Sequence, residues 1–261
     1  GDHRYLHSFP TRRSSDLWVR RLAAWGYDTI VWELENAVAW ETAPACAAPE
    51  AMSKADMRDL IALCRELGIE PIPLFQTLAH CEYVLHYPEY QYLAEIPGKV
   101  DQYCPRHPAL IPFLAAWIDE YVELFGAVRY FHLGADETLW LASCPACKAF
   151  VEAHGYSRLY IDHVNALARP LIERGVTPII WADMILHHRE ALDSLSRDIL
   201  LFDWIYRISY DWNQVVVWGR GMRDADQLDE ATFKTFGEYL RPKRLGGRLE
   251  PFYTADYLAD Q

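Results

Sequence analysis

Short apolar segments alternate with amphipathic ones along most of this chain. Five of the short segments are predicted to be buried β-strands, at 29–34, 69–75, 128–133, 177–181 and 199–204. Strict alternation of such strands with helices indicates parallel βα units. The strands end in Glu, His, Asp, Trp and Tyr, which is typical of the rim of a barrel, and no glycine-rich nucleotide-binding motif follows them. The sequence therefore predicts an α/β fold, a (β/α)₈ TIM barrel, of which five to six βα units are present.

The predicted helices lie between these strands, at 18–25, from Ser53 to Gly68, at 108–125, at 157–174 and near 189–195. Ser53 and Ser157 are each placed to cap the helix that follows. In the second helix apolar residues recur at helical spacing, and Gly68 ends the run. Within the strand at 69–75, Pro71 and Pro73 argue against a central position in the sheet, because proline has no N–H to give to a neighbouring strand.

The two ends of the chain differ from the part between them. Residues 7–17 (HSFPTRRSSDL) are polar, basic and without periodicity, and they resemble a translated sequencing adapter. We therefore treat residues 1–17 as extraneous and residues 18–261 as one partial barrel domain. The last residues, 253–261, form an amphipathic segment that no strand follows. We expect a barrel truncated at both ends.

Composition limits the classes of partner. The formal net charge is −12, which argues against nucleic acid or an anionic membrane surface, since both favour clusters of Lys and Arg. No apolar run approaches the roughly 18 residues of a membrane span.

The six cysteines do not form a small disulfide scaffold, so we expect a reducing, cytoplasmic location. Cys144 and Cys147 form a single C-x-x-C with His154 as a possible third ligand, and because structural zinc needs four ligands, no metal is expected.

The densest group of reactive residues is the segment 130–137 (YFHLGADE), where a strand leads into Gly134 and two adjacent acids follow. In a parallel barrel this position lies at the mouth, where reacting groups belong. Neighbouring carboxylates repel, so one of Asp136 and Glu137 tends to keep a proton. A protonated carboxyl is what a glycosidic oxygen needs from a general acid. The alternative from these residues alone is an acidic loop that caps the next helix.

Several segments resemble a known family. His-x-Gly-x-Asp-Glu at 132–137 is similar to the signature of glycoside hydrolase family 20, the β-N-acetylhexosaminidases. The segment 68–95 (GIEPIPLFQTLAHCEYVLHYPEYQYLAE) resembles the third-strand region of the intracellular hexosaminidase D branch. The segments 32–36 (WELEN), 181–184 (WADM) and 202–206 (FDWIY) resemble the ends of that branch's second, fifth and sixth strands. The resemblance runs in order from residue 18 to 206.

The resemblance implies an exo-acting enzyme that removes terminal GlcNAc or GalNAc from glycans or glycoconjugates with net retention. Glu137 would protonate the leaving oxygen and later activate water. The substrate's own 2-acetamido oxygen would attack the anomeric carbon, and Asp136 would hold the acetamido N–H. This mechanism requires no cofactor and no metal.

Further residues at strand ends are candidates for substrate binding. His80 follows the third-strand region, Trp181 and Trp204 end neighbouring strands, and Glu35 lies at the mouth on the same face as Glu33. Packing in the barrel core is an alternative for His132 and for both tryptophans. The full set of predicted substrate-binding residues is His80, His132, Trp181, Trp204, Glu35, Asp183 and Tyr206.

The chain also departs from the family pattern. The family's first-strand arginine would fall within residues 1–17, and nothing after residue 206 matches its seventh and eighth strands. We therefore expect an incomplete pocket, which puts the activity of this piece in doubt. Two alternatives stay open: a barrel glycosidase that pairs Glu35 with Glu137 on different strands, and a sugar-binding relative that does not catalyse. The preference between GlcNAc and GalNAc and the oligomeric state are also left open.

Overall fold

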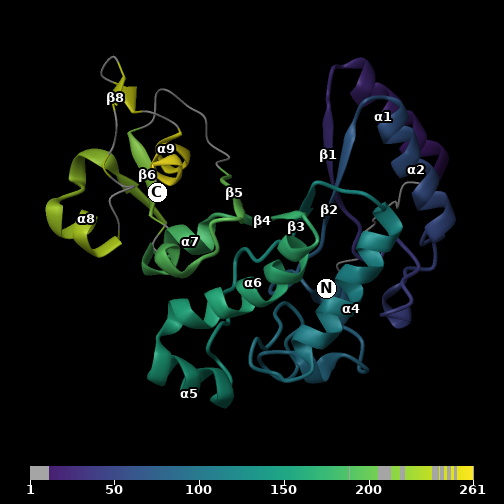
Figure 1. Ribbon diagram of the computed structural model, residues 1–261. Coiled ribbons are helices and arrows are strands. Elements are labelled where there is room, and N and C mark those ends of the chain that lie inside the picture. The colour runs from purple at the N-terminus through teal and green to yellow at the C-terminus, as the bar shows by residue number, and fades with distance from the viewer. Residues whose placement is uncertain are drawn as a thin grey trace, which may run out of the picture.

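The computed structural model describes residues 12–187, 189–204, 213–217, 221–236, 241, 244–245, 248–249 and 252–260 (Figure 1). Its main sheet has five parallel strands that lie side by side in the order of the sequence. They are β1 (Thr29–Glu33), β2 (Glu70–Leu74), β3 (Tyr130–His132), β4 (Thr177–Trp181) and β5 (Leu200–Phe202). Each falls within one of the five predicted strands, so that prediction is confirmed.

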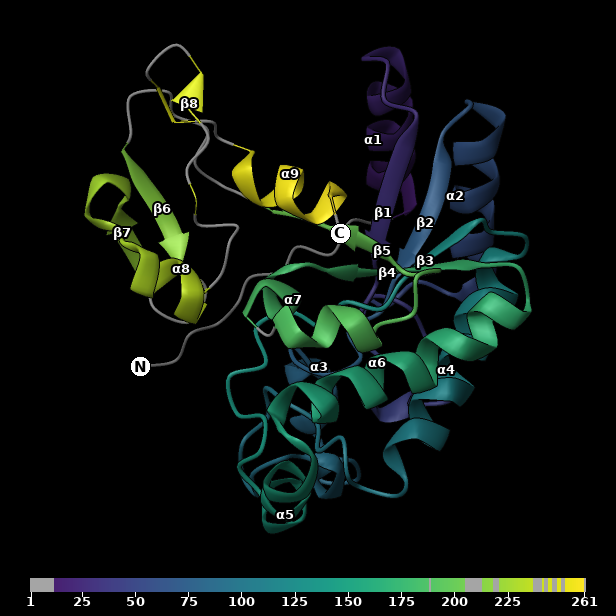
Figure 2. The ribbon, with the colours of Figure 1, turned by 60° about the vertical axis from the view of Figure 1, so that its left-hand side comes forward.

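The long helices form one layer against the sheet. They are α1 (Arg12–Ala24), α2 (Lys54–Glu66), α4 (Leu110–Phe125) and α6 (Tyr156–Glu173). Each contacts the next, α1 with α2, α2 with α4 and α4 with α6, while α2 and α4 also contact β2 and α6 contacts β4. In two views they follow one another along the outside of the sheet (Figure 1, Figure 2). Parallel strands in sequence order with a single layer of helices make a partial (β/α)₈ barrel, which confirms the predicted fold class.

Shorter elements lie in the connections between these strands and helices. They are η1 (Pro44–Cys46), α3 (Glu82–Leu85), η2 (Gln91–Leu93), α5 (Pro145–His154), α7 (Asp183–His187) and η3 (Arg189–Ser194). The segment predicted as a helix near 189–195 is thus the 3₁₀-helix η3. Among the described helices, none combines the length and apolar character that crossing a bilayer requires.

Two predicted helix starts were wrong and one is confirmed. The hydroxyl of Ser53 accepts the N–H of Asp56 and caps α2. Ser157 is not the N-cap of α6, because α6 already begins at Tyr156 after Gly155, whose φ of +89° separates α5 from α6. Helix α1 begins at Arg12 rather than at residue 18, so the boundary proposed between residues 17 and 18 falls inside a helix.

The prolines of β2 occupy a central strand, against the prediction. The N–H of Glu70 donates to the carbonyl of Asp28 on the β1 side, whereas the N–H of Phe75 donates to that of His132 on the β3 side. Because successive residues of a strand turn their N–H groups to opposite neighbours, Pro71 and Pro73 lack theirs on the β3 side. Strand β2 pairs with β3 only at its carboxyl end, Leu74 with His132, so neither proline removes a bond from the ladder.

The aromatic residues divide between core and cavity. Trp40 stacks on Tyr121 with ring centroids 4.2 Å apart, and Phe75 lies 5.0 Å from Trp117. All four side chains are buried between α4 and the strands. Core packing therefore explains a large share of the aromatic content, whereas Trp181 and Trp204 belong to the site described below.

The described strands that follow β5 do not join the five-stranded sheet. The segments after β5 comprise β6 (Gln214–Val217), β7 (Gly221–Asp224), η4 (Ala225–Gln227), α8 (Glu230–Phe236), β8 (Arg244–Leu245), β9 (Arg248–Leu249) and α9 (Tyr253–Ala259). Strands β6 and β7 pair antiparallel, as do β8 and β9. Val215, Val217, Phe233 and Tyr253 form a second core cluster with Ala182 and Leu186. In Figure 1 these segments lie across the molecule from α1 and α2.

Candidate active site

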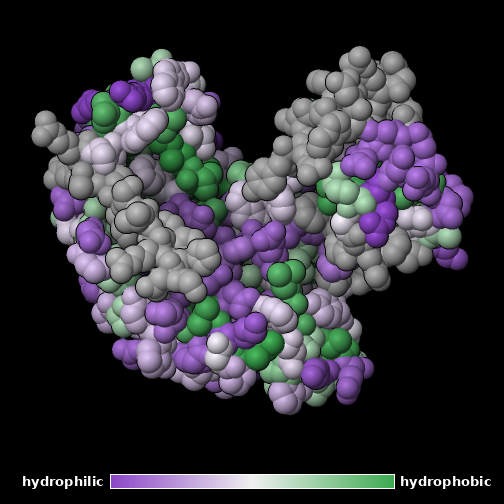
Figure 3. All heavy atoms as spheres, turned by 180° about the vertical axis from the view of Figure 1, so that it is seen from behind, coloured by the Kyte–Doolittle hydropathy of each residue, from purple (hydrophilic) through white to green (hydrophobic). Residues whose placement is uncertain are grey.

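A cavity of about 360 Å³ opens at the carboxyl ends of the five strands. Each strand supplies at least one lining residue, from its last position or from the loop that follows it. The lining residues are Glu33, Glu35, Gln76, His80, Asp136, Glu137, Trp181 and Trp204. On the face opposite to that of Figure 1, hydrophilic residues gather around the hollow in the middle of the molecule (Figure 3). Six of the nine residues predicted to form the site thus line one cavity.

His80 links the two adjacent acids. Its Nε2 lies 3.4 Å from Oδ2 of Asp136 and 3.4 Å from Oε2 of Glu137. The hydrogen bond with Asp136 is the main reason that the pKa of His80 is raised to about 9, so the imidazole is cationic at neutral pH. Repulsion between the two carboxylates alone would leave one of them protonated. A positive charge between them offsets that repulsion.

Asp136 and Glu137 differ in their access to solvent. The side chain of Glu137 is 50% exposed and that of Asp136 only 15%. Oδ1 of Asp136 is buried and has no hydrogen-bond partner within the part of the chain that the structure describes. A buried acceptor without a donor is costly. A ligand that brings an N–H or O–H group into the cavity would therefore gain a hydrogen bond there.

The backbone is strained at three residues of the cavity. Glu35, His80 and Glu137 have φ angles of +42°, +54° and +47°, in the left-handed region that costs a non-glycine residue roughly 1 kcal/mol or more. Such strain persists only where the surrounding structure enforces it, and it is concentrated at functional sites. Its presence at three lining residues supports a functional role for this cavity.

Gly134 allows two strands to approach each other closely at the floor of the cavity. A Cβ atom at this position, where φ is +64°, would lie 1.9 Å from Oε1 of Gln76. The side chain of Gln76 is buried, and its Nε2 donates to Oε1 of Glu33 at 3.0 Å. The glycine of the His-x-Gly-x-Asp-Glu segment thus leaves room for a glutamine that orients a carboxylate.

Gln76 and Glu33 are lining residues that the sequence analysis missed. Gln76 directly follows β2 and belongs to the Gln-Thr of segment 68–95, which is the signal that could have identified it. Glu33 lies on the same face of its strand as Glu35, and that alternation is the signal that could have identified it. Desolvation in the cavity raises the pKa of Glu35 to about 7 and also raises that of Glu33. Burial therefore favours the protonated form of both carboxyls, which lowers the free-energy cost of placing them in the cavity.

His132 and Asp183 were predicted to bind substrate, but they lie behind the cavity wall. His132 is fully buried, and its Nδ1 accepts the N–H of Gly134 at 3.0 Å. Burial lowers its pKa to about 3, so the ring is neutral. Oδ2 of Asp183 accepts the N–H of Glu137 at 3.0 Å, and burial raises the pKa of Asp183 to about 6. Both residues hold the backbone of the acidic segment in place.

Trp181 and Trp204 line the cavity as predicted. The ring of Trp181 also lies 4.4 Å from that of His132 and 6.1 Å from that of Phe202, so this residue both lines the cavity and packs against neighbouring rings. Tyr206 lies outside the described residues.

Comparison with known proteins agrees with this geometry. Residues 31–233 match the family described as glycosyl hydrolase family 20, catalytic domain. Hexosaminidase D of Bos taurus is 28% identical over 142 residues, which cover 53% of this chain and 41% of that protein. The chain thus spans less than half the length of this relative.

Two solved structures share the fold. The chitobiase of Flavobacterium johnsoniae has a TM-score of 0.64 at 19% identity, with 76% of this chain and 32% of that chain covered. The exo-β-N-acetylglucosaminidase of Vibrio harveyi in complex with N-acetylglucosamine has a TM-score of 0.60 at 21% identity, with 74% and 36% covered. The family match spans more than half of the chain, and it includes the strand ends that build the cavity. The chain belongs to glycosyl hydrolase family 20.

Proposed function

We propose that the protein to which this chain belongs is an exo-acting β-N-acetylhexosaminidase with a substrate-assisted, retaining mechanism. One observation carries the proposal: Asp136 and Glu137 face the same cavity in different environments. The half-exposed Glu137 is open to a leaving group and to water, whereas Asp136 presents a buried oxygen without a donor. An acetamido N–H is a donor of the kind that this oxygen lacks.

In the first step, Glu137 gives its proton to the glycosidic oxygen while the bond from the anomeric carbon to that oxygen breaks. The acetamido oxygen of the substrate attacks the same carbon and forms an oxazolinium ion. Asp136 accepts the acetamido N–H and stabilises the positive charge that develops on the ring. In the second step, the carboxylate of Glu137 takes a proton from water and the water oxygen attacks the anomeric carbon. The bond from that carbon to the acetamido oxygen breaks, which restores the acetamido group.

Other lining residues supply positioning. The cationic His80 contacts both acids and keeps their carboxyl groups at a fixed separation. The indoles of Trp181 and Trp204 provide apolar surface for the face of a sugar ring and for an acetamido methyl group. We propose terminal N-acetylhexosamine on glycans or glycoconjugates as the substrate class. The six cysteines are all free thiols, which supports the cytoplasmic location expected from the sequence.

The alternative with two carboxylates on different strands has one observation in its favour. The pKa of Glu35 is raised to about 7 by desolvation, so this carboxyl carries a proton in part of the molecules at neutral pH. In that mechanism Glu35 would be the acid and Glu137 the nucleophile, and the acetamido group would not take part.

Hydrolysis of two aryl glycosides distinguishes these mechanisms. The proposal predicts turnover of 4-methylumbelliferyl N-acetyl-β-D-glucosaminide and no detectable turnover of the corresponding β-D-glucoside. Glu137→Gln should lower kcat/KM for the acetamido substrate by about 10² to 10⁴, and Asp136→Asn should lower it as well, because the acetamido N–H loses its charged acceptor. Glu89→Gln, at an exposed glutamate outside the cavity, is the control. Equal hydrolysis of both glycosides, with a larger loss in Glu35→Gln than in Asp136→Asn, would overturn the proposal.

A further inference from the structure

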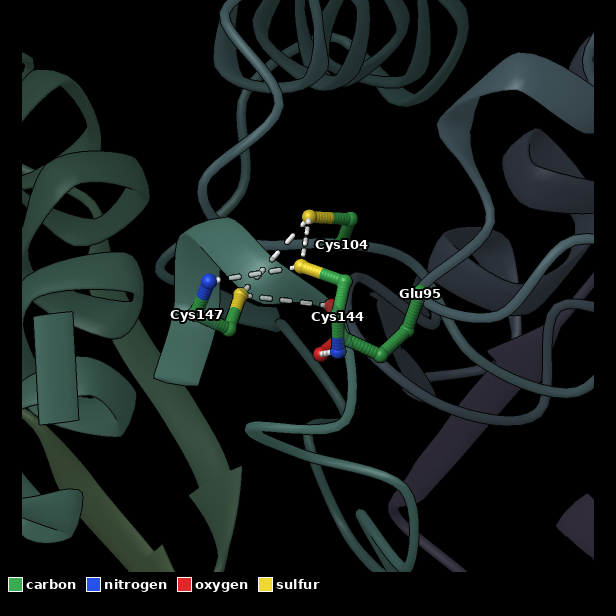
Figure 4. A group of neighbouring side chains, drawn as sticks. All are labelled: Glu95, Cys104, Cys144 and Cys147. Carbon is green, nitrogen blue, oxygen red and sulfur yellow. Dashed lines mark hydrogen bonds between the residues drawn. The ribbon is translucent and has the colours of Figure 1, made fainter. Parts of the chain in front are cut away.

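Four potential metal ligands lie together away from the cavity: Glu95, Cys104, Cys144 and Cys147 (Figure 4). Their ligand atoms all lie within 4.8 Å of one another. Sγ of Cys104 is 3.5 Å from Sγ of Cys144 and 3.7 Å from Sγ of Cys147. Sγ of Cys147 is 3.3 Å from Oε2 of Glu95. The group joins three thiols and one carboxylate around a common centre.

These separations suit a single tetrahedral ion. Bonds of about 2.3 Å from zinc to sulfur and about 2.0 Å to oxygen place the ligand atoms roughly 3.5 to 3.8 Å apart. A disulfide needs its two sulfur atoms about 2.0 Å apart, and all of these cysteines are free. Thiolates are soft ligands that favour zinc over magnesium or calcium.

The C-x-x-C pair is placed by the start of a helix. Cys144 is the N-cap of α5, Pro145 follows at the first helical position, and Cys147 lies in the first turn. The N–H of Cys147 donates to Sγ of Cys144 at 3.3 Å. Backbone N–H groups and the positive end of the helix dipole both favour negatively charged sulfur at this position.

Glu95 and Cys104 come from the loop between β2 and α4. An antiparallel bridge joins Ala94 to Tyr103 and brings the two ligands side by side. Glu95 is only 1% exposed, and its Oε1 accepts the N–H groups of Ser143 and Cys144 at 2.7 and 2.8 Å. Its other oxygen faces the thiols. Within the described part of the chain no cationic side chain pairs with Glu95, and a buried carboxylate of this kind needs a positive partner.

We propose that Glu95, Cys104, Cys144 and Cys147 bind one zinc ion as a structural site. Four protein ligands leave no open position, which is the arrangement of structural rather than catalytic zinc. The ion joins the loop after β2, which carries His80, to the loop after β3, which carries Asp136 and Glu137. It therefore holds together the two segments that place these three groups around the cavity, without contact to substrate.

The sequence analysis considered His154 as the third ligand and expected no metal. His154 lies at the far end of α5, where its ring packs at a tilt against that of Phe150 with centroids 4.6 Å apart. The additional thiol is that of Cys104, 40 residues before Cys144. No linear spacing motif contains such a set, because the fold brings two separate loops together.

Metal analysis of the full chain tests the proposal. Protein purified under reducing conditions without chelator should hold about one zinc ion per chain, and a Cys144→Ser/Cys147→Ser double variant less than about a tenth of that. A Cys46→Ser/Cys64→Ser double variant removes two buried thiols outside the cluster and should keep the metal. In cobalt-exchanged protein, Cys104→Ser should remove roughly a third of the thiolate-to-cobalt absorption.

A second measurement needs no variant. A zinc chelator should remove the metal and lower the Tm of the wild-type chain, and added zinc should restore it, because metal binding contributes directly to folding free energy. Wild-type protein that binds no zinc when zinc is offered would overturn the proposal. So would a disulfide between Cys144 and Cys147 in the reduced, metal-treated protein, or a Tm that stays the same after the zinc is removed. None of these readouts depends on hydrolytic activity.

Discussion

Asp183 is a buried carboxyl group that accepts the N–H of Glu137, and Asp183→Asn removes its charge while keeping an acceptor. Burial raises its pKa from 3.8 to about 6. At about 1.36 kcal/mol for each pKa unit, this difference corresponds to about 3 kcal/mol of unfolding free energy. Because the pKa is raised, the contribution is fully present below about pH 3.8 and is lost as the pH rises through about 6.

Urea unfolding at several pH values between 4 and 7, followed by tryptophan fluorescence, measures this effect. The difference in unfolding free energy between Asp183→Asn and wild type should change by about 2.4 kcal/mol in favour of the variant over this range, because part of the effect already lies below pH 4. Taking the difference removes the contribution of Glu35, whose pKa is also raised. Asp198→Asn, at an exposed aspartate, should run parallel to wild type. A difference for Asp183→Asn that stays constant across the range would refute the reasoning.

Three further predictions concern the cavity and the helix layer. Gly134→Ala should lower the unfolding free energy by at least about 1 kcal/mol, because alanine is strained at a positive φ. The added methyl group should also displace the side chain of Gln76 and so lower kcat/KM. In His80→Gln, the fall in kcat/KM that wild type shows as the pH rises through about 9 should disappear, because the imidazole is the group that loses a proton there. Glu120→Gln should lower the unfolding free energy by about 2 to 3 kcal/mol, because this buried carboxylate pairs with Lys54 at 2.7 Å and accepts two backbone N–H groups.

Matched controls separate these effects from general damage. Gly175→Ala also has a positive φ, +75°, but nothing lies within 4 Å of the added carbon, so this variant should lose stability without losing activity. Glu123→Gln breaks an exposed pair with Arg58 and should change the unfolding free energy by less than about 1 kcal/mol. Equal activity losses in the two glycine variants, a limb near pH 9 that persists without His80, or equal stability losses in the two glutamate variants would contradict the respective arguments.

The fold could be predicted from the sequence to a large extent, because its signals are local. Apart from Pro178, the strand at 177–181 consists of β-branched and aromatic residues, and the cap at Ser53 depends on one hydroxyl and one neighbouring N–H. The prolines of β2 were misjudged for a non-local reason. Their effect depends on which neighbour their missing N–H groups would face, and only the register between β2 and β3 decides that.

The site was predictable where a residue ends a strand and only partly predictable elsewhere. Asp136, Glu137 and Trp181 follow from the rule that reacting groups lie at the carboxyl ends of parallel strands. His132 and Asp183 are polar residues of the same region, yet both are buried behind the cavity wall. There they accept backbone N–H groups of the acidic segment and do not line the cavity. The positions of strand ends are readable in the sequence, whereas the direction in which each side chain leaves the backbone is not.

The left-handed backbone at Glu35, His80 and Glu137 has a consequence for how such a protein changes over generations. Glycine at any of these positions would release strain worth about 1 kcal/mol, so selection for stability alone favours losing these side chains. A lineage that no longer needs the reaction should therefore lose these residues early and gain thermal resistance as it does so.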